Sequence, residues 1–150
     1  MDWSRFNLHG DAPERAFEAL TGTLFERWCH REYASQIMRV VFVNGAGGDG
    51  GVEAYTQLKD DQVIGLQAKW FREPLESSQI EQIRKSLKTA SENRSGLSRY
   101  IVTIPRDLSD PKTKKQQRKT ERDRWDDFIK KSNKLYPNII MDQKRLLIRM

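Results

Sequence analysis

The chain has few of the residues that build covalent or metal-bound frameworks. Its 150 residues include one cysteine, Cys29, and two histidines, His9 and His30. A disulfide within the chain, a cysteine-based zinc site and a histidine-rich metal site are therefore excluded. No run of about 18 apolar residues is present, which excludes a transmembrane helix, and residues 1–15 lack the features of a secretory signal. We therefore expect a reduced, cytoplasmic protein with no membrane partner.

Positive charge is scarce in the first half of the chain and abundant in the second. Residues 1–75 carry 8 Lys and Arg against 11 Asp and Glu, whereas residues 76–150 carry 19 against 10. The second half has a net charge of +9, which favours binding of a polyanion such as nucleic acid. A basic surface that binds no partner is the alternative explanation of this charge. Five side chains are candidate phosphate contacts: Lys112, Lys114, Lys115, Arg118 and Lys119. A flexible basic loop is the alternative for this segment.

Apolar spacing predicts an α/β fold. A helix start at Asp11–Pro13 precedes apolar residues three and four apart up to Trp28, which indicates a buried helical face. Strands are expected at 37–43, 52–58, 63–70 and 100–104, and helices at 76–91 and around 125–129. Residues 112–124 are read as an exposed helix or a disordered loop, and 139–141 with 146–148 as a final hairpin. This order predicts a small central sheet with helices packed against it.

The length allows one domain over residues 1–150, with its core at about 11–130. The chain stops inside an apolar run, so we expect it to be a domain of a longer protein.

The expected hairpin of residues 52–70 carries the most informative pattern. Even positions from Val52 to Ala68 are mostly apolar and should share a buried face. A turn centred on Asp60 pairs residues whose numbers sum to 120. This pairing places Glu53 opposite Gln67, and Lys69 opposite Gly51, beside a loop at 44–51 with five of the nine glycines. A carboxylate, an amide and an ammonium then converge at one end of the hairpin. A solvated Glu–Lys pair on an exposed face is the alternative.

These groups suit metal-assisted hydrolysis of a phosphodiester. Mg²⁺ prefers hard oxygen ligands, which Glu53, Asp49 and either the Gln67 side chain or the Ala68 carbonyl can supply. The metal would acidify a water molecule, and Lys69 would position that water or stabilise the pentacovalent phosphate. The glycine segment also fits the dinucleotide-binding pattern G-x-G-x-x-G, but a strand and not a helix is expected after it, which argues against that reading.

The segments Gly48–Glu53 and Gln67-Ala68-Lys69 resemble the Mrr-like branch of the PD-(D/E)xK nucleases, with its GDGG-apolar-acid loop and its QxK strand. Phe17-Glu18 resembles the "FE" motif of that branch. Residues 65–71, 79–87 and 99–108 are similar to the N-terminal nuclease domains of bacterial antiviral STAND NTPases of the Avs type. The likeness spans roughly residues 14–130.

The resemblance implies a restriction-endonuclease-like core, with a four-stranded mixed sheet between helices, and Mg²⁺-dependent cleavage of DNA, with Mn²⁺ able to substitute. It makes Glu53 the main metal acid, Lys69 the catalytic lysine, Gln67 the occupant of the D/E position, and Glu18 a helper from the helix, for which Glu26 is a rival. It further implies an effector domain that acts as a dimer or tetramer once its parent protein has sensed a phage protein.

The chain departs from the pattern of the branch at its acids. Glu53 stands where Asp is usual, so Asp49 is expected to share or take over its role, and the neutral Gln67 should weaken metal binding. Two alternatives stay open: a catalytically silent DNA-binding or assembly module, and a nuclease similar to Holliday-junction resolvases.

Overall fold

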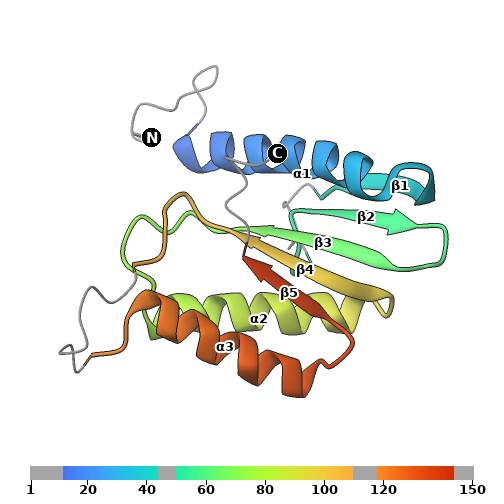
Figure 1. Cartoon of the computed structure of the whole chain (residues 1–150). Coiled ribbons are helices and arrows are strands. Elements are labelled where there is room, and N and C mark those ends of the chain that lie inside the picture. The colour runs from blue at the N-terminus through green and yellow to red at the C-terminus, as the bar shows by residue number, and fades with distance from the viewer. Residues whose placement is uncertain (1–11, 44–49, 110–117, 144–150) are drawn as a thin grey trace.

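One mixed sheet of five strands, with three helices packed against it, forms the described part of the molecule (Figure 1). The structure is a computed structural model that describes residues 12–43, 50–109 and 118–143. The helices are α1 (Pro13–Tyr33), the short 3-10 helix η2 (Ala34–Gln36), α2 (Ser77–Asn93) and α3 (Glu121–Leu135). The strands are β1 (Ile37–Phe42), β2 (Ala54–Leu58), β3 (Val63–Ala68), β4 (Leu97–Thr103) and β5 (Ile140–Gln143). The predicted α/β class is confirmed.

The sheet combines an antiparallel half and a parallel half, in the order β1-β2-β3-β4-β5. Strands β1, β2 and β3 pair antiparallel, whereas β3, β4 and β5 pair parallel, with α2 and α3 as the crossover connections. The described residues thus give one strand more than the four that the resemblance implies. The additional strand is β5, which pairs with β4 through Tyr100 and Met141. The segment expected to form a hairpin with it, 146–148, lies outside the described residues.

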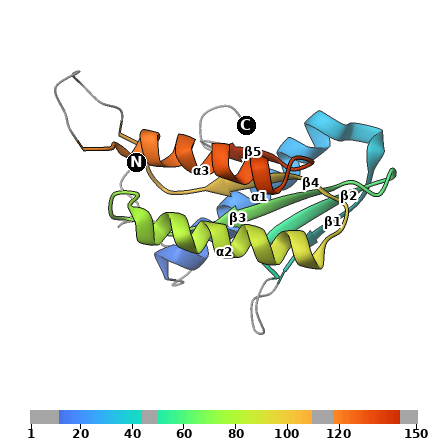
Figure 2. The ribbon, with the colours of Figure 1, turned by 90° about the horizontal axis from the view of Figure 1, so that it is seen from below.

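The two faces of the sheet are covered by different helices. Helix α1 lies on one face, and α2 and α3 lie on the other (Figures 1 and 2). The core on the α1 face contains Phe25, Trp28, Cys29, Ala54, Leu58, Ile64, Leu66 and Ile101. The core on the opposite face includes Val52, Val63, Ile83, Leu87, Tyr100, Val102, Trp125 and Phe128. Because β3 lies between both layers, all six of its residues are buried. No helix among the described residues is long and apolar enough to cross a membrane.

The register predicted for the hairpin is confirmed. Strands β2 and β3 pair Ala54 with Leu66, Tyr55 with Gly65 and Thr56 with Ile64, so the residue numbers sum to 120. One member of the even set was placed on the wrong face: Val52 is fully buried, but in the core beneath α2. The alternation does not reach Val52, because the chain bends at Glu53 and β2 begins only at Ala54.

A buried carboxylate, Glu121, joins the start of α3 to two connecting segments. Its side chain accepts hydrogen bonds from the backbone N–H of Leu75 (2.5 Å), from the backbone N–H of Ser109 (2.9 Å) and from the guanidinium of Arg106. Burial raises the pKa of Glu121, but the Arg106 guanidinium and the two backbone donors outweigh it and lower the pKa to about 2. Residues 112–124 are predicted to be one exposed helix or one disordered loop; of those that the structure describes, 118–120 precede α3 and 121–124 belong to it.

Candidate functional site

Glu53 and Gln67 meet at the end of the hairpin where the sequence places them. The amide Nε2 of Gln67 donates a hydrogen bond to Oε1 of Glu53 at 2.8 Å and another to the carbonyl of Ala68 at 3.2 Å. Gln67 is fully buried, whereas Glu53 is half-buried. The alternative of a solvated polar face is therefore wrong for Gln67. Since its nitrogen faces Glu53, Gln67 in this geometry orients the carboxylate by donating to it.

The backbone around Glu53 is fixed by contacts with three strands. Its N–H donates to the carbonyl of Leu66 at 2.7 Å, and its carbonyl accepts from the N–H of Val43 at 2.8 Å. Just before it, Gly51 has φ +83°, and the hydroxyl of Tyr100 on β4 donates to the Gly51 carbonyl at 2.8 Å. Glycine adopts this left-handed backbone at little cost. The Glu53 carboxylate thus extends from a bend that β3, β4 and the residue after β1 all help to position.

Lys69 follows β3 at the same end of the sheet, two residues after Gln67. Its backbone N–H donates to the carbonyl of Thr103 at 2.9 Å. The predicted pairing of Lys69 with Gly51 is not formed, because the ladder between β2 and β3 ends at Ala54 and Leu66. The Lys69 side chain is half-exposed and makes no hydrogen bond or ion pair with the other described residues. An ammonium in this position is accessible to a phosphate.

Helix α1 brings Glu18 to this end of the sheet. The rings of Phe17 and Trp70 lie 5.4 Å apart between centroids, so the first turns of α1 pack against the residue that follows Lys69. Glu26 lies eight residues further along the helix, which is about 12 Å at the usual rise per residue. Both side chains are half-buried. The Phe17–Trp70 contact therefore favours Glu18 over Glu26 as the acid nearest to the end of β3.

The predicted metal-binding set has two carboxylates in the described part of the chain. Asp49 lies outside the described residues, which leaves Glu18 and Glu53 as the described carboxylates of the predicted set. Within residues 12–43, 50–109 and 118–143, no three His, Cys, Asp or Glu side chains come together in a way that could bind a metal ion. Carboxylate and carbonyl oxygens are nonetheless the donors that Mg²⁺ prefers, and Glu53 and the Ala68 carbonyl both approach the Gln67 amide.

The candidate phosphate contacts of the basic segment are mostly beyond the described residues. Lys112, Lys114 and Lys115 lie outside them. Arg118 and Lys119 are exposed at the start of α3, where the Nζ of Lys119 lies 2.5 Å from Oδ2 of Asp127. Because such an exposed ion pair is weak, Lys119 can leave Asp127 and bind a phosphate instead.

Two groups near the candidate site were not identified by the sequence patterns. The Thr103 hydroxyl is buried at the end of β4 and has no hydrogen-bond partner in the described part of the chain. Arg94, at the end of α2, donates to the carbonyl of Gly50 at 2.8 Å and lies over the ring of Tyr55. No short sequence motif contains Thr103 or Arg94. Both approach the candidate site only because α2 and β4 pack beside it.

Comparisons with known proteins were made at three levels. No protein-family model, no curated protein and no solved structure matches the chain. The site is described by its own groups: a carboxylate that accepts from a buried amide, a half-exposed lysine two residues after that amide, and a second carboxylate on the part of α1 that packs against Trp70. Groups of these kinds can bind a divalent cation and stabilise negative charge on a phosphate.

Proposed function

We propose that the chain is a metal-dependent DNA endonuclease domain that hydrolyses phosphodiester bonds. The observation that carries this proposal is the hydrogen bond of 2.8 Å from Gln67 Nε2 to Glu53 Oε1. It joins the acid after the glycine segment to the Q-x-K strand, two motifs that lie on the two arms of one hairpin. The resemblance to the Mrr-like PD-(D/E)xK nucleases gives the same residues their roles and supports the reaction class.

The roles follow from the chemistry of each side chain. A bound Mg²⁺, or Mn²⁺ in its place, would supply an acidified water and neutralise charge on the scissile phosphate. Glu53 and Glu18, with Asp49, would bind this ion through carboxylate oxygens. Gln67 orients the Glu53 carboxylate by donating to it. The Lys69 ammonium stabilises the additional negative charge of the pentacovalent phosphate or positions the attacking water.

We further propose that the domain is the effector of an antiviral NTPase of the STAND class. In this proposal a phage protein triggers assembly of the cytoplasmic parent protein, and assembly brings two or four copies of the domain together on DNA. The neutral Gln67 supports this idea, because a site with few acids binds Mg²⁺ weakly. Such a site stays idle until several copies act on the same substrate.

The test is cleavage of a supercoiled plasmid with Mg²⁺ or with EDTA, by the chain alone and by a version fused to an oligomerising domain. We expect cleavage with Mg²⁺ only, and faster cleavage by the fusion. Lys69→Ala should lower the rate about 100-fold or more, because it removes a charge that stabilises the transition state. Lys59→Ala is the matched control, since Lys59 is exposed at the turn of the same hairpin. Circular dichroism of each variant checks that the fold is retained.

The outcomes separate the two candidate functions. Cleavage that survives Lys69→Ala, or that EDTA leaves unchanged, would refute the assignment of this site. If neither form of the protein cuts DNA although both bind it, the chain is a DNA-binding or assembly module in which Glu53 and Gln67 have a structural role.

A further inference from the structure

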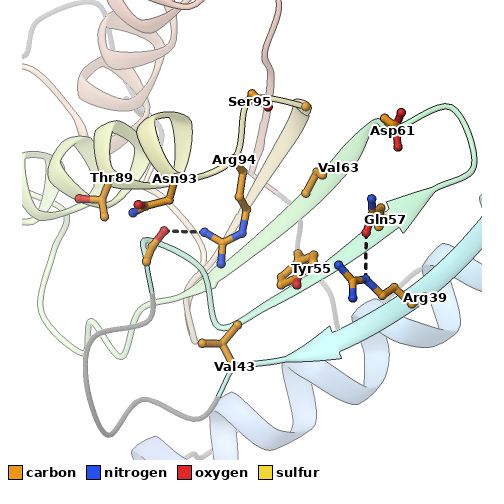
Figure 3. A pocket seen from close by; sticks show the side chains of 12 residues that line it. Arg39, Val43, Tyr55, Gln57, Asp61, Val63, Thr89, Asn93, Arg94 and Ser95 are labelled. Carbon is orange, nitrogen blue, oxygen red and sulfur yellow. Dashed lines mark hydrogen bonds between the residues drawn. The ribbon is translucent and has the colours of Figure 1, made fainter.

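A polar cavity lies beside the end of α2, on the side of the sheet that α2 covers. It has a volume of about 980 Å³ and is formed by the exposed faces of β1 and β2 and the end of α2 (Figure 3). We name it the arginine groove, and its defining residues are Arg39, Tyr55, Gln57, Asn93 and Arg94. The sizes of ligand-binding pockets are about 300–1,000 Å³, so the groove is large enough to bind a ligand of substantial size.

Arg94 is oriented toward the groove by two contacts. Its Nη1 donates to the carbonyl of Gly50 at 2.8 Å, and its Cζ lies 4.9 Å from the centroid of the Tyr55 ring (Figure 3). A guanidinium has five N–H donors in a plane, and the described residues accept from one of them. The remaining donors, on a side chain that is already ordered, suit the bidentate recognition of a phosphate.

Arg39 supplies a second guanidinium from the edge strand. Its Nε donates to Oε1 of Gln57 on β2 at 2.9 Å, and the dashed line in Figure 3 marks this bond. Because Nε makes this contact, both terminal nitrogens of Arg39 lie beyond it and can bind a ligand. Among the described residues that line the groove, two arginines stand against one acid, Asp61, so their net charge is positive.

The groove is continuous with the backbone of the candidate active site. Val43 and Gly50 line the groove, and the N–H of Val43 donates to the carbonyl of Glu53 at 2.8 Å. A chain of phosphates that extends past Glu53 over β2 and β1 therefore meets Arg94 and then Arg39. Cationic grooves that follow a backbone, with aromatic side chains beside them, are typical of proteins that bind single-stranded nucleic acid.

We propose that the arginine groove binds the phosphodiester backbone of one nucleic-acid strand that leads to the Glu53–Lys69 site, with phosphates at Arg94 and Arg39. This proposal rests on the proposed function for the identity of the substrate. It adds a defined path for a strand over β1, β2 and the end of α2. It also assigns Arg39, Tyr55 and Arg94 to substrate binding.

The test measures binding in EDTA, where metal-dependent cleavage does not occur. A fluorescein-labelled oligothymidylate and a labelled DNA duplex are titrated with the wild type, Arg39→Gln and Arg94→Gln at several salt concentrations. Arg27→Gln is the control, because Arg27 is an exposed arginine on α1, on the other face of the sheet. Each groove variant should weaken binding of the single strand about tenfold, the value of one hydrogen bond between charged groups. Each should also lower the steepness with which the logarithm of the binding constant falls against the logarithm of the salt concentration (the salt slope) by about 0.7.

Three results would overturn the proposal: unchanged binding in both groove variants, an equal loss in Arg27→Gln, or a loss of affinity without a change in salt slope. Arg39→Gln keeps the test valid if Arg94→Gln is unstable, because Arg39 is exposed and does not contact the Gly50 carbonyl. A slope change near 0.9 with the duplex alone would assign the contacts to double-stranded DNA. If the wild type binds through the groove but never cuts plasmid, the nuclease proposal fails and the groove proposal stands.

Discussion

Replacing Glu121 by glutamine should cost a large part of the stability of the domain. Its carboxylate is 3% exposed and accepts hydrogen bonds from Leu75, Arg106 and Ser109, which belong to two separate connecting segments. Glu121→Gln keeps the size of the side chain but removes its charge. The Arg106 guanidinium then loses its ionic partner, and the added NH₂ group faces N–H donors.

The magnitude follows from the pKa of Glu121, which is lowered from 4.5 to about 2. A carboxyl with such a change on folding contributes about 3 kcal/mol at pH 7. Because the pKa of the folded state is the lower one, this contribution is complete above pH 4.5 and is lost as the pH falls toward 2. The difference between wild type and variant should therefore shrink to about 1 kcal/mol near pH 2.5.

Urea unfolding at pH 7, 4 and 2.5 measures this difference, since urea leaves the ionic strength unchanged. Glu81→Gln is the control: Glu81 pairs with Arg84 at 2.6 Å, but both side chains are more than 40% exposed. Pairs of this kind contribute little to stability. A loss below about 1 kcal/mol at pH 7 in Glu121→Gln, or a loss that does not change between pH 7 and 2.5, would refute the electrostatic reasoning.

Two further predictions concern stability and use the same urea assay. Gly51→Ala should cost about 3 kcal/mol or more, because φ is +83° and a Cβ atom would lie 2.6 Å from the backbone nitrogen of Ala90. Gly50→Ala should cost only about 1 kcal/mol, since its Cβ would meet the movable Arg94 side chain; equal losses would contradict the packing argument. Thr56→Val should stabilise the domain by about 1 kcal/mol, because the buried Thr56 hydroxyl has no partner among the described residues. A destabilised Thr56→Val variant would indicate that this hydroxyl has a partner.

Much of the hairpin could be predicted from local rules. Alternation and a turn at Asp60 were sufficient to give the register of β2 and β3 and the contact between Glu53 and Gln67. Such rules work where a strand is regular and one face is more apolar than the other. They fail at Val52, because a bend interrupts the alternation before β2 begins.

Features that depend on the packing of distant elements could not be predicted. The apolar residues 139–141 predict a strand, but the sequence pairs it with 146–148 in a hairpin and does not indicate β4 as its neighbour. Its parallel pairing with β4 requires α3 to cross over the sheet. The position of Gln67 in a strand could be predicted, but its complete burial could not, because it depends on the elements that pack around the end of β3.

The glycine pair links the candidate active site to the arginine groove. Tyr100 of β4 donates to the Gly51 carbonyl, and Arg94 at the end of α2 donates to the Gly50 carbonyl. Glu53 follows within three residues, so its position depends on contacts with both elements. A ligand that changes the orientation of Arg94 would act on the same short segment that orients the carboxylate. Binding of a strand in the groove and binding of a metal ion at Glu53 are therefore expected to be coupled, each changing the affinity for the other by the same factor.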